Sequence, residues 1–366
     1  MNDEAWDTEH PVLNLLRKRR QEGSLPGERT DTAKLGLAIE GGGMRGVVSA
    51  SMLTAIDDLG FANTIDHVYA CSSGAINGAY YLAGGTWYPL TIYFDDLSTP
   101  NFVDLRRAFS KKPILNLEHA FNVLDEIKPL DYEYVINSRI PLHIAITLVD
   151  EMKTIVADSF DSVDDLKEAL RASAWLPVAV KGAANYKGQR AVDGGALTAL
   201  PFRLALQDSC THILSLSTHP MGGGSGSISL LNRYTRRHLN QLQPHLGDGY
   251  FKALDQKYED QHSLAAMRNA ATYDEPYIFD AAPLPGTPDL KRHELDGNKL
   301  LEAGRSAYEV MYAALQGKRS SAVRDGLIRA MPRFAVAERD DDNRRLIKLF
   351  DQNSGRYLPW GIARRK

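Results

Sequence analysis

The sequence has few cysteines, no surplus of positive charge and no long apolar run. Its 366 residues include only Cys71 and Cys210, whereas a disulfide scaffold or a cysteine-ligated zinc site needs more. A formal net charge of −3 excludes a global basic field for nucleic acid. No segment is long and apolar enough to span a bilayer, and the acidic start MNDEAWDTEH is unlike a secretory signal. We therefore expect a cytoplasmic globular protein.

The distribution of apolar runs predicts one large domain with two appendages. Residues 1–34 form an N-terminal leader, residues 35–318 the main domain (a motif core at 35–215 and an extension at 228–318), and residues 319–366 a C-terminal tail. In the leader, PVLNLLRKRR predicts a short helix whose Val12, Leu15 and Leu16 pack on the domain. Anchoring on a membrane surface is the alternative for this basic run.

Strands and helices alternate from residue 35 to residue 220, which is typical of an α/β fold with three layers, α/β/α, around a mainly parallel central sheet. LGLAIE, starting at Leu35, is apolar on both faces, as a central parallel strand is. The following helix is expected to end at Gly60. Further strands are expected in VYACS, HIAITLVD, TIVADSF, the run before Asp193, HILSLSTHP and YIFDAA, with helices near 118–127, 164–174, 228–243 and 298–315.

Two other segments carry hypotheses of their own. Residues 87–141 mix aromatic and proline-containing stretches, and we expect lids or insertions there; MGGGSGS at 221–227 has the composition of a flexible loop. The helix at 228–243 is expected to have Tyr234 on its apolar face and carries Arg233, Arg236 and Arg237 without matching acids. It is either a surface helix or an interfacial helix that meets anionic lipid.

A glycine turn follows the first strand. Residues 41–46, GGGMRG, satisfy the pattern G-x-G-x-x-G between a strand and a helix, so a dinucleotide site has to be weighed. That site needs an acidic residue at the end of the next strand, where this chain has Cys71 and Ser72. A glycine turn at a helix N-terminus binds negative charge of any kind, including a transient oxyanion. We therefore expect no nucleotide cofactor and no metal.

A serine turn follows the second strand. Ser72 lies where strand meets helix, with Gly74 two residues later and Ala70 two residues before, which approximates the strained G-x-S-x-G elbow. If the first two strands are neighbours, the Gly42 and Gly43 amides lie near Ser72, as acyl transfer requires. Tight packing is the simpler explanation of one such turn, but two successive turns of this kind favour an active site.

A serine hydroxyl needs a base to become a good nucleophile. Asp193 stands at a strand end before Gly194 and Gly195, which let the backbone approach closely. Its alternative role is that of a turn residue bonding its own backbone. His212 and His219 follow on the next strand and leave a Ser-Asp-His triad open. The other histidines show no spacing that suggests metal ligation.

Together, GGGMRG, SSGAING, ASAWLP and DGGALTALP resemble the patatin-like phospholipase family in their order and spacing. The resemblance covers about residues 35–215. It implies an α/β lipid acyl hydrolase with a Ser-Asp dyad and no catalytic histidine: Ser72 as nucleophile, Asp193 as base, and Gly41, Gly42, Gly43 and Arg45 as the oxyanion loop. Gly74, Gly194 and Gly195 support the two turns. The chain departs from the family pattern at Ala70, where the family has glycine, so an added methyl could crowd the elbow.

The resemblance also implies a phospholipid or another long-chain ester as substrate, with peripheral contact with a membrane as a further expectation. Acyl transfer to an alcohol or lipid acceptor is the alternative reaction for the same residues. A catalytically weak lipid-binding or regulatory protein is the alternative from another class, supported only by Ala70. A nicotinamide-dependent oxidoreductase is the least favoured reading, for the reason given above.

Overall fold

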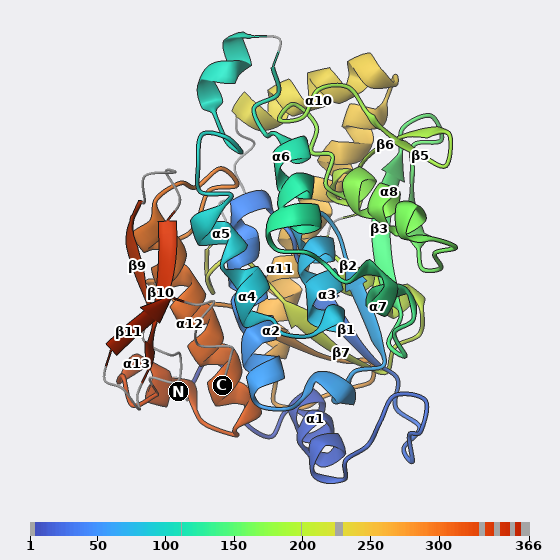
Figure 1. Cartoon of the computed structure of the whole chain (residues 1–366). Coiled ribbons are helices and arrows are strands. Elements are labelled where there is room, and N and C mark those ends of the chain that lie inside the picture. Colours follow the sequence, from blue (N-terminus) through green and yellow to red (C-terminus); the bar gives the residue numbers. More distant parts are fainter. Residues whose placement is uncertain are drawn as a thin grey trace.

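The computed structural model places a mixed β-sheet between two layers of helices (Figure 1). It describes residues 4–110, 112–198, 200–223 and 230–328, together with the backbone of strands at 334–339, 345–351 and 356–359. Most of the glycine-rich segment and much of the C-terminal tail therefore lie outside the described residues. The boundaries given above for leader, main domain and tail stay a prediction.

The central sheet contains eight strands among the described residues. They are β1 Leu35–Ile39, β2 His67–Ala70, β3 Leu142–Leu148, β4 Lys153–Ala157, β5 Ala184–Tyr186, β6 Gln189–Asp193, β7 His212–Leu216 and β8 Tyr277–Ala281. Strands β3, β2, β1, β7 and β8 are successively parallel. The predicted three-layer fold with a mainly parallel sheet is confirmed, and β1 and β2 are neighbours, as expected.

The three antiparallel strands lie around β3, and their arrangement positions the site. Ile144 of β3 pairs with Ala70 of β2 and with Ala157 of β4, so β2 and β4 flank β3 on opposite sides. Residues 146–148 pair with both β4 and β6. Strand β6 must then lie on the same side of β3 as β2, beyond the carboxyl end of β2. This brings the end of β6, at Asp193, to the turn that follows β2.

Helices cover both faces of the sheet. They are α1 Pro11–Gln21, α2 Gly46–Asp58, α3 Ser73–Ala83, α4 Trp87–Leu90, α5 Ile92–Asp95, α6 Leu117–Asn122, α7 Tyr132–Ile136, α8 Val163–Ser173, α9 Phe202–Gln207, α10 Leu230–Leu242, α11 Leu246–Met267, α12 Gly297–Leu315 and α13 Ser320–Arg324. Short 3-10 turns occur at Gly43–Arg45, Ala62–Thr64, Leu105–Phe109 and Gly194–Ala196, and a π-helical turn at Val123–Ile127 continues α6.

Strand alternation divides the core into two parts. Leu35, Leu37 and Ile39 face the larger cluster, built with α2, α3 and α12, because alternate residues of a strand point to opposite faces. Ala38 and Tyr69 face a smaller cluster with α9 and α11. Burial of this kind contributes roughly 25 cal/mol per Å² of apolar surface. The sheet is covered on both faces, as its apolar strands predict.

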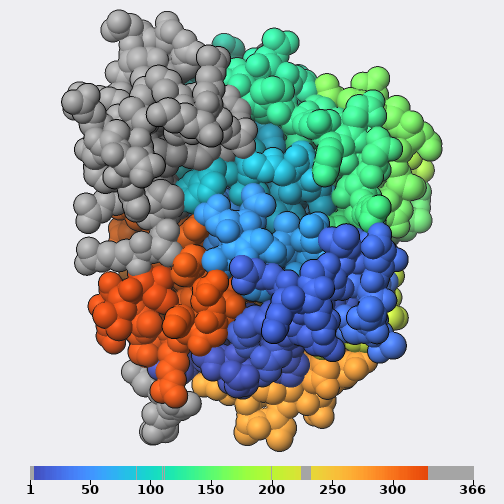
Figure 2. Space-filling model, turned by 60° about the horizontal axis from the view of Figure 1, so that its bottom comes forward, coloured from blue at the N-terminus to red at the C-terminus, as the bar shows by residue number. Residues whose placement is uncertain are grey.

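The N-terminal leader packs on the main domain. Val12, Leu13 and Leu16 of α1 are fully buried. Arg19 is buried too, and its guanidinium lies 2.7 Å from carboxylates of both Asp31 and Asp66. In Figure 2 the leader, in dark blue, lies against the orange segments near residues 260–280 and 300–325. Packing, rather than anchoring in a membrane, accounts for this basic run.

The structure corrects the reading of the arginine-rich helix, α10. Tyr234 is 59% exposed, while Leu239 is fully buried. Arg236 is matched by an acid after all, because Asp248 of α11 lies 2.6 Å away. Helix α11 itself was not predicted. None of the helices in the described residues combines the length and apolarity needed to cross a membrane.

The segments read from the sequence as insertions and tail also form regular elements. Helices α4 to α7 lie within residues 87–141. At the C-terminal end, β9 Phe334–Arg339, β10 Arg345–Asp351 and β11 Arg356–Pro359 form a separate antiparallel sheet. The sequence did not predict these three strands.

Candidate active site

Ser72 occupies a strained turn between β2 and α3. Its φ of 57° and ψ of −138° lie in a region that side chains other than glycine rarely adopt, at a cost of about 1–3 kcal/mol. Its N–H donates to Ser173 Oγ at 2.9 Å, and that hydroxyl donates to the Ala145 carbonyl at 2.8 Å. Helix α8 and strand β3 thus hold the turn. Ala70 is fully buried in the core one residue before Cys71, so its methyl is accommodated.

The glycine turn and the serine turn touch each other. A Cβ at Gly41 would lie 2.4 Å from the Cys71 carbonyl oxygen, and a Cβ at Gly74 would lie 2.5 Å from the Ile39 carbonyl oxygen. Neither position has room for a side chain. The absence of side chains at both positions therefore brings the turn after β1 directly against the turn after β2.

The backbone N–H groups of the glycine turn differ in whether they already donate a hydrogen bond. Gly42 donates its N–H to Ser73 Oγ at 3.0 Å, and Met44 donates to the Arg292 carbonyl at 3.0 Å. The Gly43 N–H makes no hydrogen bond to the residues that the structure describes. Gly43 has a φ of 61°, and a Cβ there would meet the Arg292 carbonyl at 2.5 Å. Of the two amides expected as oxyanion donors, Gly43 is the one left available.

The Arg45 side chain packs against the glycine turn. It is buried, and a Cβ at Gly42 would lie 2.7 Å from its guanidinium. Burial and the positive charge of Arg292 lower the pKa of Arg45 to about 10, although Glu40 opposes the shift. Arg45 therefore stays charged at neutral pH and adds positive potential behind the glycine amides.

A buried ion pair lies beside Arg45. Lys257 Nζ, on α11, is 2.5 Å from Glu40 Oε1, and Glu40 Oε2 accepts hydrogen bonds from the Thr218 N–H and hydroxyl at 2.6 and 2.9 Å. Burial is the largest single influence and would raise the pKa of Glu40, but Lys257, His219 and Arg45 together outweigh it, so the pKa is lowered. Burial lowers the pKa of Lys257. Lys257 was not predicted from the sequence, although the helical spacing of Leu246, Tyr250 and Ala253 could have indicated its helix.

Asp193 combines the two roles weighed from the sequence. Oδ1 accepts the Gly195 N–H at 2.7 Å, which is the turn-forming bond. Oδ2 is buried and has no hydrogen bond of normal geometry to any described residue. Burial raises the pKa of Asp193, while the nearby Ser72 hydroxyl lowers it without reversing the shift. Strand β6 can lie close to β3 because residue 194 is a glycine. A Cβ at this position would lie only 2.3 Å from the Ala145 carbonyl oxygen. Asp193 is thus a buried carboxylate of raised basicity beside Ser72.

The two histidines weighed for a triad lie elsewhere. His212 begins β7, paired with Leu35, at the sheet edge opposite the Ser72 turn. His219 lies past the other end of β7, but its Nδ1 is 2.8 Å from Asp289, and neither residue lines the cavity around Ser72. The geometry therefore gives no support to a triad through His212 or His219. His293, which the sequence did not single out, does line this cavity.

A cavity of about 310 Å³ opens over the two turns. Its lining includes Ser72, Asp193 and the three glycines, together with Tyr250 and Lys257 from α11 and Arg292 and His293 from the loop before α12. Its walls are mainly apolar and include Leu105, Ile114, Leu115, Leu176, Pro177 and Val178. The size and apolar lining suit the hydrocarbon portion of a ligand.

A strained serine turn against a glycine turn, on a mostly parallel sheet flanked by helices, is the architecture of an α/β acyl hydrolase. Residues 37–206 match the family model of patatin-like phospholipase. The resemblance noted in the sequence is confirmed. The family match supports lipid acyl hydrolase activity in general.

Among solved structures, the chain is similar to VipD from Legionella pneumophila, with a TM-score of 0.43 and 12% identity, covering 79% of this chain and 68% of that chain. No curated protein sequence matches the chain.

Proposed function

We propose that the protein is a serine lipid acyl hydrolase that forms an acyl-enzyme on Ser72, with Asp193 as the general base. The observation that carries this proposal is the placement of a strained serine beside a buried carboxylate whose second oxygen lacks a conventional partner. A carboxylate of raised pKa is a stronger base than an exposed one. The arrangement needs no histidine.

The reaction follows from the contacts at the base of the cavity. Asp193 Oδ2 takes the Ser72 hydroxyl proton while Oγ attacks the ester carbonyl carbon. The negative charge that develops on the carbonyl oxygen is stabilised by the Gly43 N–H and by the nearby N-terminus of α3. Collapse of the intermediate breaks the ester bond, and the departing alcohol takes the proton from Asp193. Water, deprotonated by Asp193, then releases the fatty acid and regenerates Ser72.

The cavity supports an amphiphilic ester with a negatively charged head as substrate. Its apolar walls suit an acyl chain, whereas Arg292 is exposed at the lining and its side chain makes no hydrogen bond or ion pair with the described residues. The other two cations of the lining, Arg45 and Lys257, both lie close to Glu40. The charge of Arg292 is thus available to bind a phosphate group, which favours a phospholipid over a neutral glyceride as substrate.

Replacing Arg292 tests this substrate assignment. R292Q keeps the backbone carbonyl that binds Met44 but removes the charge, so we expect activity on an anionic phospholipid to fall at least about tenfold relative to activity on a neutral diacylglycerol. The measurement is fatty-acid release from mixed micelles of each lipid. An unchanged ratio between the two substrates would assign Arg292 a role in the fold alone.

Peripheral contact with a membrane is part of the proposal. Helix α10 contributes Thr235 to the cavity lining and exposes Arg233, Tyr234 and Arg237. An exposed basic and aromatic surface next to the cavity would hold its mouth at an anionic interface. The double variant R233E/R237E should sediment less with vesicles containing phosphatidylserine while hydrolysing a water-soluble ester normally. Equal sedimentation of variant and wild type would show that α10 does not contribute to membrane binding.

The reaction itself is tested on a short-chain ester, which does not depend on lipid binding. S72A should abolish release of the acid, and H293A should retain most of it, because Asp193 rather than His293 is the proposed base. Turnover by S72A at the wild-type rate, or loss of turnover in H293A with an intact circular dichroism spectrum, would contradict the dyad. Adding an alcohol acceptor and identifying the product separates hydrolysis from acyl transfer.

A further inference from the structure

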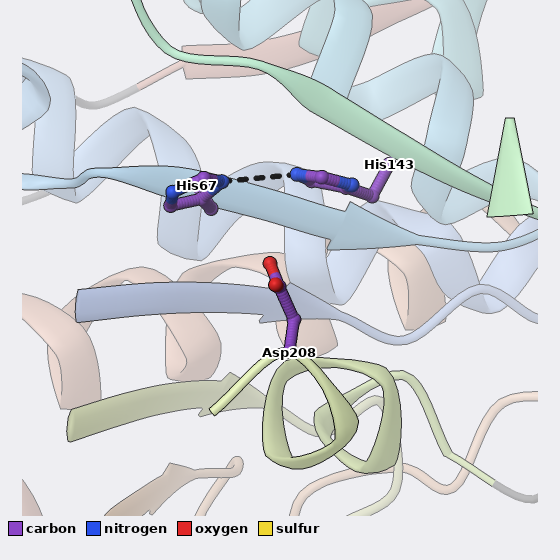
Figure 3. A group of neighbouring side chains, drawn as sticks. All are labelled: His67, His143 and Asp208. Carbon is purple, nitrogen blue, oxygen red and sulfur yellow. Dashed lines mark hydrogen bonds between the residues drawn. The ribbon is translucent and has the colours of Figure 1, made fainter. Parts of the chain in front are cut away.

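A second cluster of chemically active side chains lies far from Ser72. His67 begins β2, His143 is the second residue of β3, and Asp208 follows the last residue of α9. His143 pairs with Tyr69, two residues after His67, so both imidazoles point to the sheet face covered by α9. Figure 3 shows the Asp208 carboxylate directed toward the two rings. The cluster lies at the amino end of β2, whereas Ser72 follows its carboxyl end.

The three side chains converge as metal ligands do. One nitrogen or oxygen from each residue lies within 4.8 Å of those of the other two. His67 Nδ1 and His143 Nε2 are 3.0 Å apart and share a hydrogen bond, so one of these nitrogens already presents a lone pair to the other. In a tetrahedral zinc site two ligand nitrogens are separated by about 3.4 Å. The two nitrogens would need to move apart by a few tenths of an ångström, and the rings to turn so that both lone pairs face the ion.

Other groups hold these ligands from behind. His143 Nδ1, the nitrogen turned away from His67, is 3.7 Å from Asp158 Oδ2. The Tyr69 hydroxyl donates to Asp208 Oδ2. Metal-binding histidines commonly direct their second nitrogen to a carboxylate, and metal-binding carboxylates are commonly hydrogen-bonded in turn. The cluster has both features.

Lys34 is the group that competes with a cation here. Its Nζ is 2.8 Å from Asp208 Oδ2 and also donates to the Asp208 carbonyl at 2.8 Å. Asp208 Oδ1 makes no hydrogen bond or ion pair with the residues that the structure describes. The Asp208 side chain is 42% exposed, so water can reach the cluster and complete a fourth position. Lys34 therefore weakens cation binding without occupying the available oxygen.

We propose that His67 Nδ1, His143 Nε2 and Asp208 Oδ1 bind a divalent transition-metal ion, for which zinc is the best match, with water as the fourth ligand. Two imidazoles, one carboxylate and water form a set that zinc accepts. On binding, the proton between the rings moves to the other nitrogen of its own imidazole, so both rings stay neutral. The ion joins β2, β3 and α9 and acts on stability, because the cluster is at the end of the sheet opposite Ser72.

Calorimetric titration of zinc into the chelator-treated full chain tests the proposal. We expect one zinc ion per chain and a zinc-dependent rise in the thermal midpoint of unfolding. H67Q and D208N should each lower the affinity at least about tenfold. H245Q is the matched control, because exposed His245 lies 3.3 Å from Asp248 outside the cluster. No binding by the wild type, wild-type affinity in H67Q, or an equal loss in H245Q would overturn the proposal.

Replacing Lys34 gives a test whose expected result, a higher zinc affinity, cannot arise from unfolding of the variant. Because K34M removes the competing cation and leaves all three ligands, it should raise the zinc affinity. Unchanged or lower affinity in K34M would contradict the ligand geometry. H67Q should hydrolyse a short-chain ester at the wild-type rate with or without zinc; zinc-dependent hydrolysis by the wild type would contradict the purely stabilising role.

Discussion

Asp193 shows how the proposed reaction depends on the environment of one residue. Its pKa is raised by burial, so the folded state favours the protonated form more than the unfolded state does. Activity needs the ionised form, and it should be lost as the pH falls through this raised pKa. We therefore expect the acid limb of kcat/KM to lie above the ordinary aspartate range.

The same shift predicts the stability of D193N. At a pH above the raised pKa, ionising the buried carboxylate lowers the free energy of unfolding, and below the unfolded pKa this cost is absent. Asparagine avoids the charge and can still accept the Gly195 N–H. D193N should therefore be inactive but at least as stable as the wild type at neutral pH, as measured by urea unfolding. A marked loss of stability in D193N would show that the ionised carboxylate stabilises the fold.

At the scale of elements, helix α11 is joined to strand β1 by the Glu40–Lys257 pair. Glu40 is buried, the Lys257 side chain is 16% exposed, and the two residues lie 217 positions apart in the sequence. Removing one partner of such a pair leaves a buried charge and commonly costs about 3–5 kcal/mol. K257M should lower the free energy of unfolding by that order and should disturb the adjacent glycine turn.

A double variant separates the charge from the packing. E40Q/K257M leaves neither charge buried, so it should recover much of the stability lost in K257M. Chemical denaturation of the two variants and the wild type gives the comparison. If the double variant is no more stable than K257M, the pair does not account for the joining of α11 to β1.

At the scale of the whole molecule, local chemistry explains what could be predicted. The turns at Gly41 and Ser72, the strands before them and the Asp193 turn depend on residue types within a few positions, and the sequence predicted them. Lys257, Arg292 and the cavity walls come from distant segments whose position depends on tertiary packing. The pairing of Arg236 with Asp248 and of His67 with His143 could not be predicted for the same reason. In the proposed oxyanion loop, too, the sequence could not indicate which amide is available, because only the structure shows that the Gly42 amide donates to Ser73.

Covalent labelling by a fluorophosphonate, located by peptide mass spectrometry, tests directly whether Asp193 activates Ser72. We expect a single adduct on Ser72 in the wild type, and a labelling rate in D193N lower by at least about 100-fold. Labelling at another residue, no labelling of the folded wild type, or equal rates in the wild type and D193N would contradict the proposed dyad.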